Sequence, residues 1–529
     1  MNSIKSIFRQ HGPFVLGLLV VLLYNLNLLG FNLQYLPGDL GDGRFNNYLL
    51  EHAYKFFTFQ LDSFWEAPFM YPEEQVISYS DNLLGTVPLY GLFRFMNIGV
   101  EQSFQYWFIA LNFLNYYCCY LFLKWWTNNR MAGVLGALLF AISLCLISQT
   151  PHVQTIPRFA VPLTFWALLL FKESFKTKHF LVACLLLVYQ FYCALYLGFF
   201  LAVPFGVFLL GIIIKHWSRF KDHLRNRKWI LQIIGSGIIS LLVLLPLMLP
   251  YYERSKIMGL KSFHEIFPTL PSLYSYLTAN YGAIVWEPLE QTAQGYQFEW
   301  DHHIYVGALG TISFVICIVL LVRTWKKSNK KKVLFKREGF SLFLISGLVC
   351  FLLFLRVGDF SLYAIIHFVP GYGALRALTR IVNIELIFFA ACFAFLTLRI
   401  LNRYPKVAPL SFIVLLVLLV VDNFAIGEKS SRISKEIVID RRLDLIEQME
   451  HVPKGEIVSY EPVDSTYHHP NVYQIDAMMA SQALGLKCIN GYSATSPQGF
   501  NHYWDNPNEE TRKIWLDTKG KDVKLHVIP

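Results

Sequence analysis

The chain has 529 residues, of which 55% are hydrophobic and 16% are charged, and its mean hydropathy is +0.41. This composition is too apolar for a soluble multidomain protein and indicates a polytopic membrane protein. The formal net charge of +10 comes largely from lysines and arginines in short loops, so it describes topology and gives no case for nucleic acid binding.

Long apolar segments recur along the chain. A helix needs about 20 residues to cross roughly 30 Å of hydrocarbon, and about eleven segments approach this length. They lie near 13–31, 104–123, 131–149, 159–171, 179–196, 200–214, 229–250, 304–322, 340–355, 381–398 and 408–425. The sequence therefore predicts an all-α transmembrane domain over residues 1–425.

Basic residues in short loops predict the orientation, because lysine and arginine stay on the cytoplasmic side. They cluster at 5–9, 124–130, 172–178, 215–228, 323–337 and 399–406. The amino terminus is then cytoplasmic, and the exoplasmic segments are 31–103, 150–158, 251–303, 356–380 and 426–529. The chain has no Asn-x-Ser/Thr sequon, which favours a bacterial inner membrane. We interpret the apolar segment 83–98, which contains Pro88 and Arg94, as interfacial or re-entrant.

An acidic turn, Pro-Gly-Asp-Leu-Gly-Asp-Gly-Arg at 37–44, directly follows the first apolar segment. Asp39 and Asp42 belong at the membrane surface, because charges are costly inside hydrocarbon. Two carboxylates three residues apart can enter one cavity, where one abstracts a proton and the other orients it or binds a cation. The alternative is that Asp42 is the N-cap of a helix and Asp39 caps the turn.

A helix is expected over 43–58, where apolar residues recur at helical spacing. Its opposite face carries Arg44, Tyr48, Glu51, His52 and Lys55. We expect this amphipathic helix to lie in the plane of the membrane surface, with its polar face toward water or an enzyme cavity. Arg44 and His52 are therefore candidate substrate contacts.

Three further exoplasmic segments supply charged groups. His152 and Arg158 lie in 149–158, His302 lies in Glu-Trp-Asp-His-His at 299–303, and Arg376 and Arg380 follow Pro-Gly at 370–371. The planar guanidinium of arginine suits phosphate oxygens, so these arginines are candidate phosphate contacts. The alternative is that they reach lipid headgroups, or that Arg376 and Arg380 pair with a carboxylate inside the next span.

No cofactor is required by any pattern in the sequence. The histidines show no i, i+4 pair of the kind that forms a helical zinc site. Two carboxylates, Asp39 and Asp42, suit Mg²⁺ or Mn²⁺, which stays open as an alternative. No P-loop, Rossmann or Gly-x-Ser-x-Gly pattern occurs, so nucleotide-driven pumping and serine hydrolysis lose support.

The tail 426–529 has ordinary soluble composition. It contains a strand-like segment at 456–460, a helix-like segment at 471–486 and turn residues at 490–491. The sequence predicts a small α/β exoplasmic domain here.

These features together resemble the GT-C superfamily of polytopic glycosyltransferases: an acidic motif after the first span, an interfacial helix, about eleven spans and a soluble carboxy-terminal domain. The Gly-Asp-x-Gly-Asp-x-Arg turn, the His-x-Gln-x-x-Pro-Arg segment at 152–158 and the Pro-Gly-x-x-x-x-Arg-x-x-x-Arg element at 370–380 also look like those of related bacterial membrane proteins. Many members of the superfamily have Asp-Glu or Asp-x-Asp where this chain has Asp-x-x-Asp.

The resemblance implies an inverting transferase that moves a sugar from a polyprenyl-phosphate donor to a glycan, lipid or protein acceptor on the exoplasmic face. It implies that Asp42, or alternatively Asp39, is the general base. A sugar leaving a lipid phosphate needs a base and cations but no strong acid, because phosphate is a stable anion. A transporter or flippase of envelope lipids is the alternative of another class, and a lipid-linked polysaccharide ligase or polymerase is the closer one.

Overall fold

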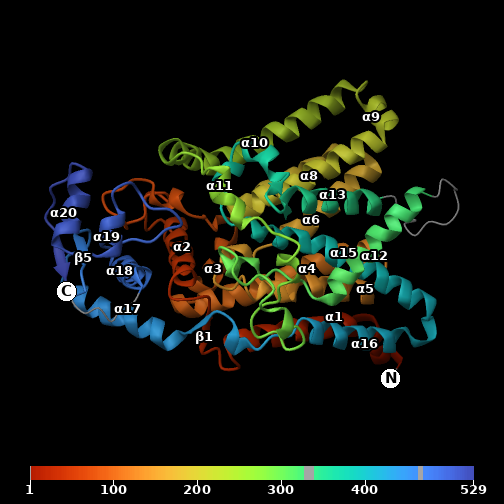
Figure 1. Ribbon diagram of the computed structural model, residues 1–529, viewed down its shortest axis with the longest axis horizontal. Helices are drawn as coiled ribbons and strands as arrows, with labels where there is room; N and C mark the ends of the chain where they lie inside the picture. Colours follow the sequence, from red (N-terminus) through yellow and green to blue (C-terminus); the bar gives the residue numbers. More distant parts are fainter. Residues whose placement is uncertain (1, 327–338, 463–468) are drawn as a thin grey trace.

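A computed structural model describes residues 2–326, 339–462 and 469–529. The chain is nearly all α-helical, with a bundle of apolar helices at one end and the carboxy-terminal elements at the other (Figure 1). The basic loop expected at 323–337 lies largely outside the described residues, as do the side chains of Lys5 and Arg9.

The elements of the bundle and its loops are α1 (Asn2–Leu29), β1 (Tyr35–Pro37), α2 (Asp42–Phe57), α3 (Val87–Phe95), α4 (Val100–Thr127), α5 (Arg130–Ile142), α6 (Ala160–Ser174), α7 (Thr177–Cys193), α8 (Leu195–Lys215), α9 (Trp217–His223), α10 (Arg227–Met258), α11 (Phe263–Ile266), α12 (Ala308–Lys326), α13 (Gly339–Phe354), β2 (Arg356–Val357), β3 (Phe360–Ser361), α14 (Tyr363–His367), α15 (Val382–Arg403) and α16 (Ala408–Asp422). The carboxy-terminal elements are β4 (Arg432–Ser434), α17 (Lys435–Met449), β5 (Ile457–Tyr460), α18 (Pro470–Leu484), β6 (Lys487–Cys488), α19 (Asn501–Asp505), α20 (Glu509–Thr518) and β7 (His526–Ile528).

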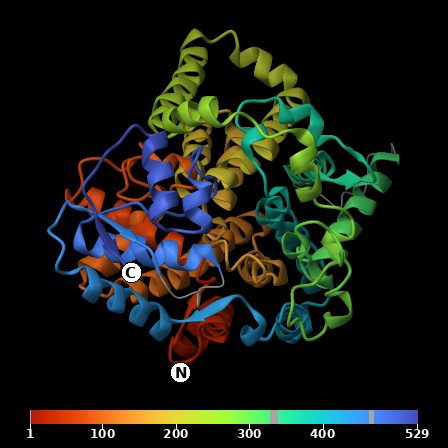
Figure 2. The same ribbon diagram turned by 60° about the vertical axis from the view of Figure 1, so that its left-hand side comes forward.

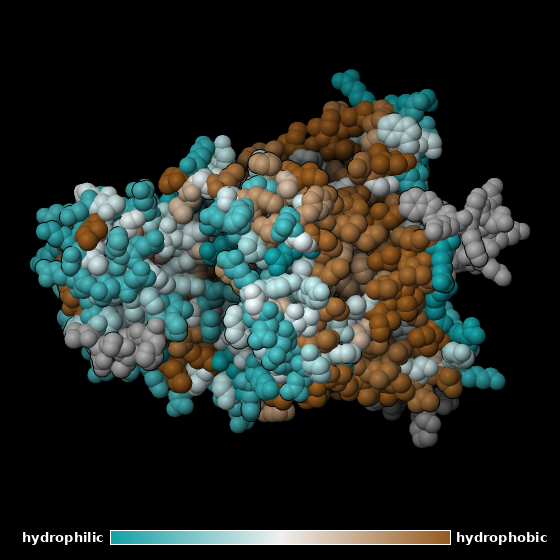
Figure 3. Space-filling model, in the orientation of Figure 1, coloured by the Kyte–Doolittle hydropathy of each residue, from teal (hydrophilic) through white to brown (hydrophobic). Residues whose placement is uncertain are grey.

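Within the described residues, 7 helical segments are long and apolar enough to cross a membrane. They are His11–Leu29, Val100–Thr127, Val153–Ser174, Leu195–Lys215, Arg227–Met258, Leu378–Arg403 and Pro405–Asp422. Shorter apolar helices, α5, α7, α12 and α13, occupy the places of the other expected spans. Figure 3 shows the resulting apolar surface as a broad brown area, beside a hydrophilic end formed by the carboxy-terminal elements. The chain is thus a multi-pass membrane protein by the length and composition of its helices.

The centre of the bundle is formed by α5 and α15, which pack closely along their length. A Cβ on Gly136 of α5 would lie 2.8 Å from both the Ala390 carbonyl oxygen and the Ala394 Cβ of α15. Small residues of this kind let the backbones of membrane helices approach each other. The segment that contains α15 is the most buried of the apolar helices, whereas α10 and α16 lie at the edge.

The segment 83–98 contains the helix α3, which is 9 residues long and packs on α4. Nine residues of helix are too short to cross a bilayer, which takes about 20. Leu92, Phe95 and Met96 are exposed beside the start of the α4 span, whereas Val87 and Tyr90 are buried. This arrangement agrees with the interfacial interpretation.

The helix expected at 43–58 is present as α2, but its predicted surroundings are wrong. Arg44, Tyr48, Glu51 and His52 on its polar face are all buried, so this face is not turned to water. The carboxy-terminal helix α18 covers it, and the two elements lie side by side in both ribbon views (Figures 1 and 2). The face expected toward water or an enzyme cavity is instead buried, with Arg44 paired with Asp476 of α18, Glu51 with Arg94 of α3 and His52 against the Phe64 carbonyl.

The carboxy-terminal elements contain a small parallel sheet in the order β6-β5-β7. The membrane part joins this sheet through the backbone of the loop between α2 and α3, where Met70 donates to the Asn490 carbonyl and Cys488 donates to the Pro68 carbonyl. In addition, β1 pairs antiparallel with β4. One hydrophobic cluster contains both Leu28 of α1 and Trp515 of α20, so the two parts share a core.

Asp476 joins three helices through buried charges. It accepts from Arg44 of α2 and from Arg441 of α17, and the Arg441 Nη2 lies 2.6 Å from the Asp476 Oδ2. Asp476 and Arg44 are almost wholly buried. Removing one partner of a buried ion pair leaves the other charge uncompensated, which costs much more than an exposed pair contributes.

We therefore expect Asp476→Ala to destabilise the protein by about 3 to 5 kcal/mol, because it leaves both arginines without their carboxylate. The apparent melting temperature of the detergent-solubilised protein measures the loss. Glu428→Gln is the matched control, since Glu428 is 84% exposed and lies 3.9 Å from its partner Arg432. An equal loss in the two variants would contradict the role given to Asp476.

Candidate functional site

The two carboxylates of the acidic turn have different roles. The Asp39 Oδ1 accepts hydrogen bonds from the backbone N–H groups of Gly41 and Gly43, at 3.1 and 3.2 Å. Asp39 therefore caps the start of α2, and the alternative that it serves the turn is confirmed. The turn also requires glycine at position 38, where φ is +96°.

Asp42 is the first residue of α2, and its side chain makes no capping hydrogen bond to the helix. The alternative that Asp42 is an N-cap is therefore wrong. Its Oδ2 instead lies 2.8 Å from the His152 Nδ1, and its Oδ1 accepts a hydrogen bond from the Tyr492 hydroxyl. The first turn of α2 thus presents a carboxylate to groups that are far away in the sequence.

His152 lies between two carboxylates. Its Nδ1 contacts Asp42, and its Nε2 lies 3.9 Å from the Asp301 Oδ1. The side chains of Asp42, His152 and Asp301 are 28%, 21% and 21% exposed, so a molecule from outside can reach them. The loop 147–158, the short helical turn Glu299–His302 and the first turn of α2 meet here.

The surroundings shift the pKa values of Asp39 and Asp42 in opposite directions. Burial raises the pKa of Asp39, and the nearby Asp42 charge raises it further. Burial would also raise the pKa of Asp42, but the contact with His152, the hydrogen bond from Tyr492 and the charge of Arg380 outweigh burial and lower it to about 2. Asp42 is therefore ionised at neutral pH.

The arginines expected to bind phosphate lie at the edge of this group. The charge of Arg380 lowers the pKa of Asp42. Burial raises the pKa of Tyr492, and the charge of Arg376 opposes that rise. The Arg380 guanidinium lies 5.7 Å from the centre of the Tyr196 ring, and its buried Nε has no hydrogen-bond partner within the described residues. Arg376 is exposed. The structure thus joins Asp42 and His152 in direct contact, and the charges of Arg380 and Arg376 act on Asp42 and Tyr492 respectively.

Four other expected site residues lie elsewhere. Arg44 pairs with Asp476, and the His52 Nε2 lies 2.8 Å from the Phe64 carbonyl oxygen. The His302 Nδ1 lies 2.7 Å from the Ser275 hydroxyl. Arg158 is fully buried among α5, α15 and its own loop, where it donates to the carbonyls of residues 140 and 155 and to the Asn383 side chain. Each of the four has protein partners away from Asp42.

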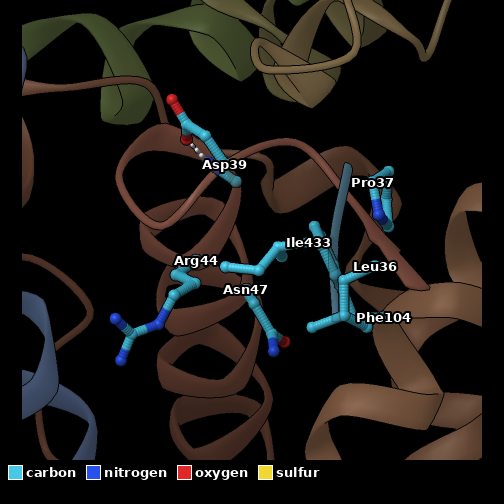
Figure 4. Close-up of a pocket in the computed structure, with 8 residues that line it drawn as sticks. Leu36, Pro37, Asp39, Arg44, Asn47, Phe104 and Ile433 are labelled. Carbon is cyan, nitrogen blue, oxygen red and sulfur yellow. Dashed lines mark hydrogen bonds between the residues drawn. The ribbon is translucent and has the colours of Figure 1, made fainter. Parts of the chain in front are cut away.

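A narrow hollow lies on another side of the first turn of α2. Figure 4 shows it between α2 and the strand that carries Ile433, with the Asp39 carboxylate pointing away from Arg44 and Asn47. The lining of the hollow does not include Asp42 or His152. We therefore place the chemical centre at Asp42 and not in this hollow.

Sequence reasoning missed Tyr492 as a site residue and noted Asp301 only as part of an acidic loop end. The signal at 490–491 was an Asn-Gly pair, which indicates a turn but not what the turn contacts. Tyr492 reaches Asp42 because its ring packs edge-on against Phe45, with the ring centres 5.2 Å apart. Only the folded chain brings these positions together.

Within the described residues, no group of three or more His, Cys, Asp or Glu side chains is arranged to hold a metal ion. No protein-family model matches the chain, and no curated protein matches it either. The resemblance to the GT-C superfamily therefore stays a prediction, and the site is argued from its geometry alone.

Asp81 is a second carboxylate near Arg380. It is buried, and its Oδ1 accepts hydrogen bonds from the backbone N–H groups of Leu195 and Asn82 at 2.8 and 2.9 Å. Burial raises the pKa of Asp81 to about 6, although these bonds and the charge of Arg380 act in the opposite direction. A carboxyl whose pKa is raised by folding adds stability below its unfolded pKa and loses it as the pH rises through the folded value.

We expect Asp81→Asn to stabilise the protein at about pH 8 by about 2 to 3 kcal/mol, because the amide keeps an acceptor oxygen without a buried charge. At about pH 4 the difference between variant and wild type is expected to vanish, since Asp81 is then protonated in the folded protein. Apparent melting temperatures at both pH values measure this. Asp359→Asn, which changes an exposed carboxylate, is the control. A gap that does not depend on pH would contradict the prediction.

Proposed function

We propose that this membrane protein is an inverting glycosyltransferase that uses a polyprenyl-phosphate sugar, with its site on the exoplasmic face of a bacterial inner membrane. One observation carries the proposal. An ionised Asp42 is held by His152 and Tyr492 within electrostatic reach of Arg380, and the charge of Arg376 acts on Tyr492. A proton acceptor and cations for a phosphate are the groups that this reaction needs.

Asp42 and His152 are proposed to accept the proton together. A carboxylate with a pKa of about 2 is by itself a weak base at neutral pH. The imidazole of His152 is the proposed acceptor: the Asp42 Oδ2 lies 2.8 Å from its Nδ1, and a hydrogen on that nitrogen would leave the lone pair on Nε2. Asp42 would hold the ring and stabilise the positive charge that proton transfer creates.

The reaction balances without a further reactant. The acceptor hydroxyl gives its proton to the Asp42–His152 pair, and its oxygen forms a bond to the anomeric carbon of the donor sugar. The bond from this carbon to the phosphate oxygen breaks, and the polyprenyl phosphate leaves with the electron pair. Attack opposite the leaving group inverts the anomeric configuration.

Arg380 is the proposed contact of the donor phosphate. It lies just before α15, in the first turn of the apolar helical segment Leu378–Arg403. A lipid phosphate sits at this depth in a bilayer, because its prenyl chain stays in the hydrocarbon and its charge stays at the surface. The buried Nε of Arg380 is available to a ligand, having no hydrogen-bond partner within the part of the chain that is described.

We expect Asp42→Asn and His152→Gln each to lower sugar transfer by about 10²- to 10⁴-fold, because each removes half of the proton-accepting pair. The assay follows transfer from a radiolabelled polyprenyl-phosphate sugar pool in membranes that contain each variant. Asp359→Asn, an exposed carboxylate of another exoplasmic loop, is the control and is expected to keep full transfer. Full transfer by both site variants would refute the proposal.

Arg380→Ala is expected to raise the KM for the lipid-phosphate donor by roughly 10-fold or more, because a charge-assisted contact is lost. Arg380→Lys is expected to recover part of this loss, since it keeps the charge but not the planar fork. Donor titrations in detergent measure both. If neither variant changes the donor KM, Arg380 does not hold the phosphate. Movement of labelled lipid across reconstituted vesicles without a new glycosidic bond would favour a flippase instead.

A further inference from the structure

An exposed tryptophan precedes Asp301, the carboxylate that approaches His152 of the proposed chemical centre. Trp300 is 73% exposed, although it is a large aromatic residue. The next residue, Asp301, reaches to 3.9 Å from the Nε2 of His152. Trp300 therefore belongs to the same short helical turn, Glu299–His302, as the carboxylate that approaches His152.

The ring of Trp300 is held in place from behind. It lies against His303 with ring centres 6.3 Å apart and an angle of 25° between the planes, and its centre is 4.9 Å from that of Tyr281. His303 is almost fully buried, and its Nδ1 lies 2.5 Å from the Ala279 carbonyl oxygen. A fixed ring with one free face is a preformed binding surface.

Acidic groups flank this ring. Glu299 accepts from the Tyr281 hydroxyl at 3.0 Å and from the Gly295 N–H at 3.3 Å, so its carboxylate has a fixed position. The segment between Lys261 and His303 contains no lysine or arginine. Arg356, from another loop, lies over the Tyr296 ring, with its guanidinium 4.7 Å from the ring centre. The neighbourhood of Trp300 is thus aromatic and acidic, whereas Arg376 and Arg380 are on the loop 371–380.

We propose that Trp300, with Glu299 and Asp301 at its edges, is a binding subsite for an uncharged sugar ring of the acceptor. The C–H groups on one face of a pyranose are apolar and slightly positive, and they complement the negative face of an indole ring. Carboxylates accept hydrogen bonds from sugar hydroxyls and repel uronic acids. Only the identification of this sugar as the acceptor rests on the proposed function.

A place in the lipid headgroup region is the other role open to an exposed tryptophan. The two neighbouring carboxylates oppose it, because charged side chains are costly to bring into a membrane. Asp301 is also directed at His152, so this turn faces the site and not the lipid. In Figure 3 the surface between the brown area and the carboxy-terminal end is pale or hydrophilic, and the green loops of Figure 1 lie there.

Saturation-transfer NMR on the full chain in lipid nanodiscs tests the subsite. The probes are the methyl glycosides of glucose, galactose, mannose and N-acetylglucosamine, with methyl glucuronide as the charged comparison. We expect at least one neutral glycoside to bind the wild type, Trp300→Ala to weaken this binding by roughly 10-fold, and Trp300→Tyr to keep most of it. Trp217→Ala is the matched control, because Trp217 is an exposed tryptophan (55%) at the start of α9.

The inference fails if no neutral glycoside binds, if glucuronide binds equally well, or if Trp300→Ala binds like the wild type, as it would if Trp300 served the lipid. Asp42→Asn separates this failure from that of the proposed function. It is expected to bind glycosides normally while losing transfer. Lost transfer in Asp42→Asn without glycoside binding by the wild type would leave the transferase standing and remove the subsite.

Discussion

The buried charge cluster around Asp476 is the constraint on which the site depends. Arg44 follows Asp42 by two residues, so the ion pair from Arg44 to Asp476 fixes the first turn of α2 against α18. Tyr492 follows α18 and can reach Asp42 only when this contact is made. Buried ion pairs contribute little to net stability, but their geometry specifies one arrangement of the helices that carry them. Here that arrangement brings the carboxy-terminal elements to the acidic turn that carries Asp42.

Local patterns predicted the elements well. Apolar segments of membrane length became the helical bundle, and the acidic turn, the helix after it and the strand at 457–460 lie within one or two residues of their predicted positions. These features depend on spacing along the chain, which the sequence contains. The different roles of Asp39 and Asp42 depend instead on their partners. Backbone N–H groups bind Asp39, whereas side chains from distant segments bind Asp42.

The contacts that define the site were beyond sequence reasoning for a physical reason. Arg44 and His52 are charged or polar residues on a helix, and such residues are mostly exposed, so they were assigned to a cavity. Both are buried because Asp476 and the Phe64 carbonyl supply partners from elsewhere. Arg158 is similar, since Asn383 of α15 satisfies it inside the bundle. A single sequence does not tell which polar residue has a distant partner.

The buried donor of Arg380 that no group of the described protein satisfies is a candidate ligand contact. The buried Nε atoms of Arg380, Arg44 and Arg158 all lack a hydrogen-bond partner in the described residues, but Arg44 and Arg158 donate to protein groups through their terminal nitrogens. Leaving a buried donor unpaired costs free energy, so such a group is expected where a ligand supplies the partner. Arg380 and the free face of Trp300 are the two unfilled surfaces beside the Asp42–His152 pair. One is cationic and lies at the end of an apolar helix, and the other is aromatic and flanked by acids. A lipid phosphate and a neutral sugar differ in these same properties, which is why the two proposed substrates would approach one proton acceptor from surfaces of opposite character.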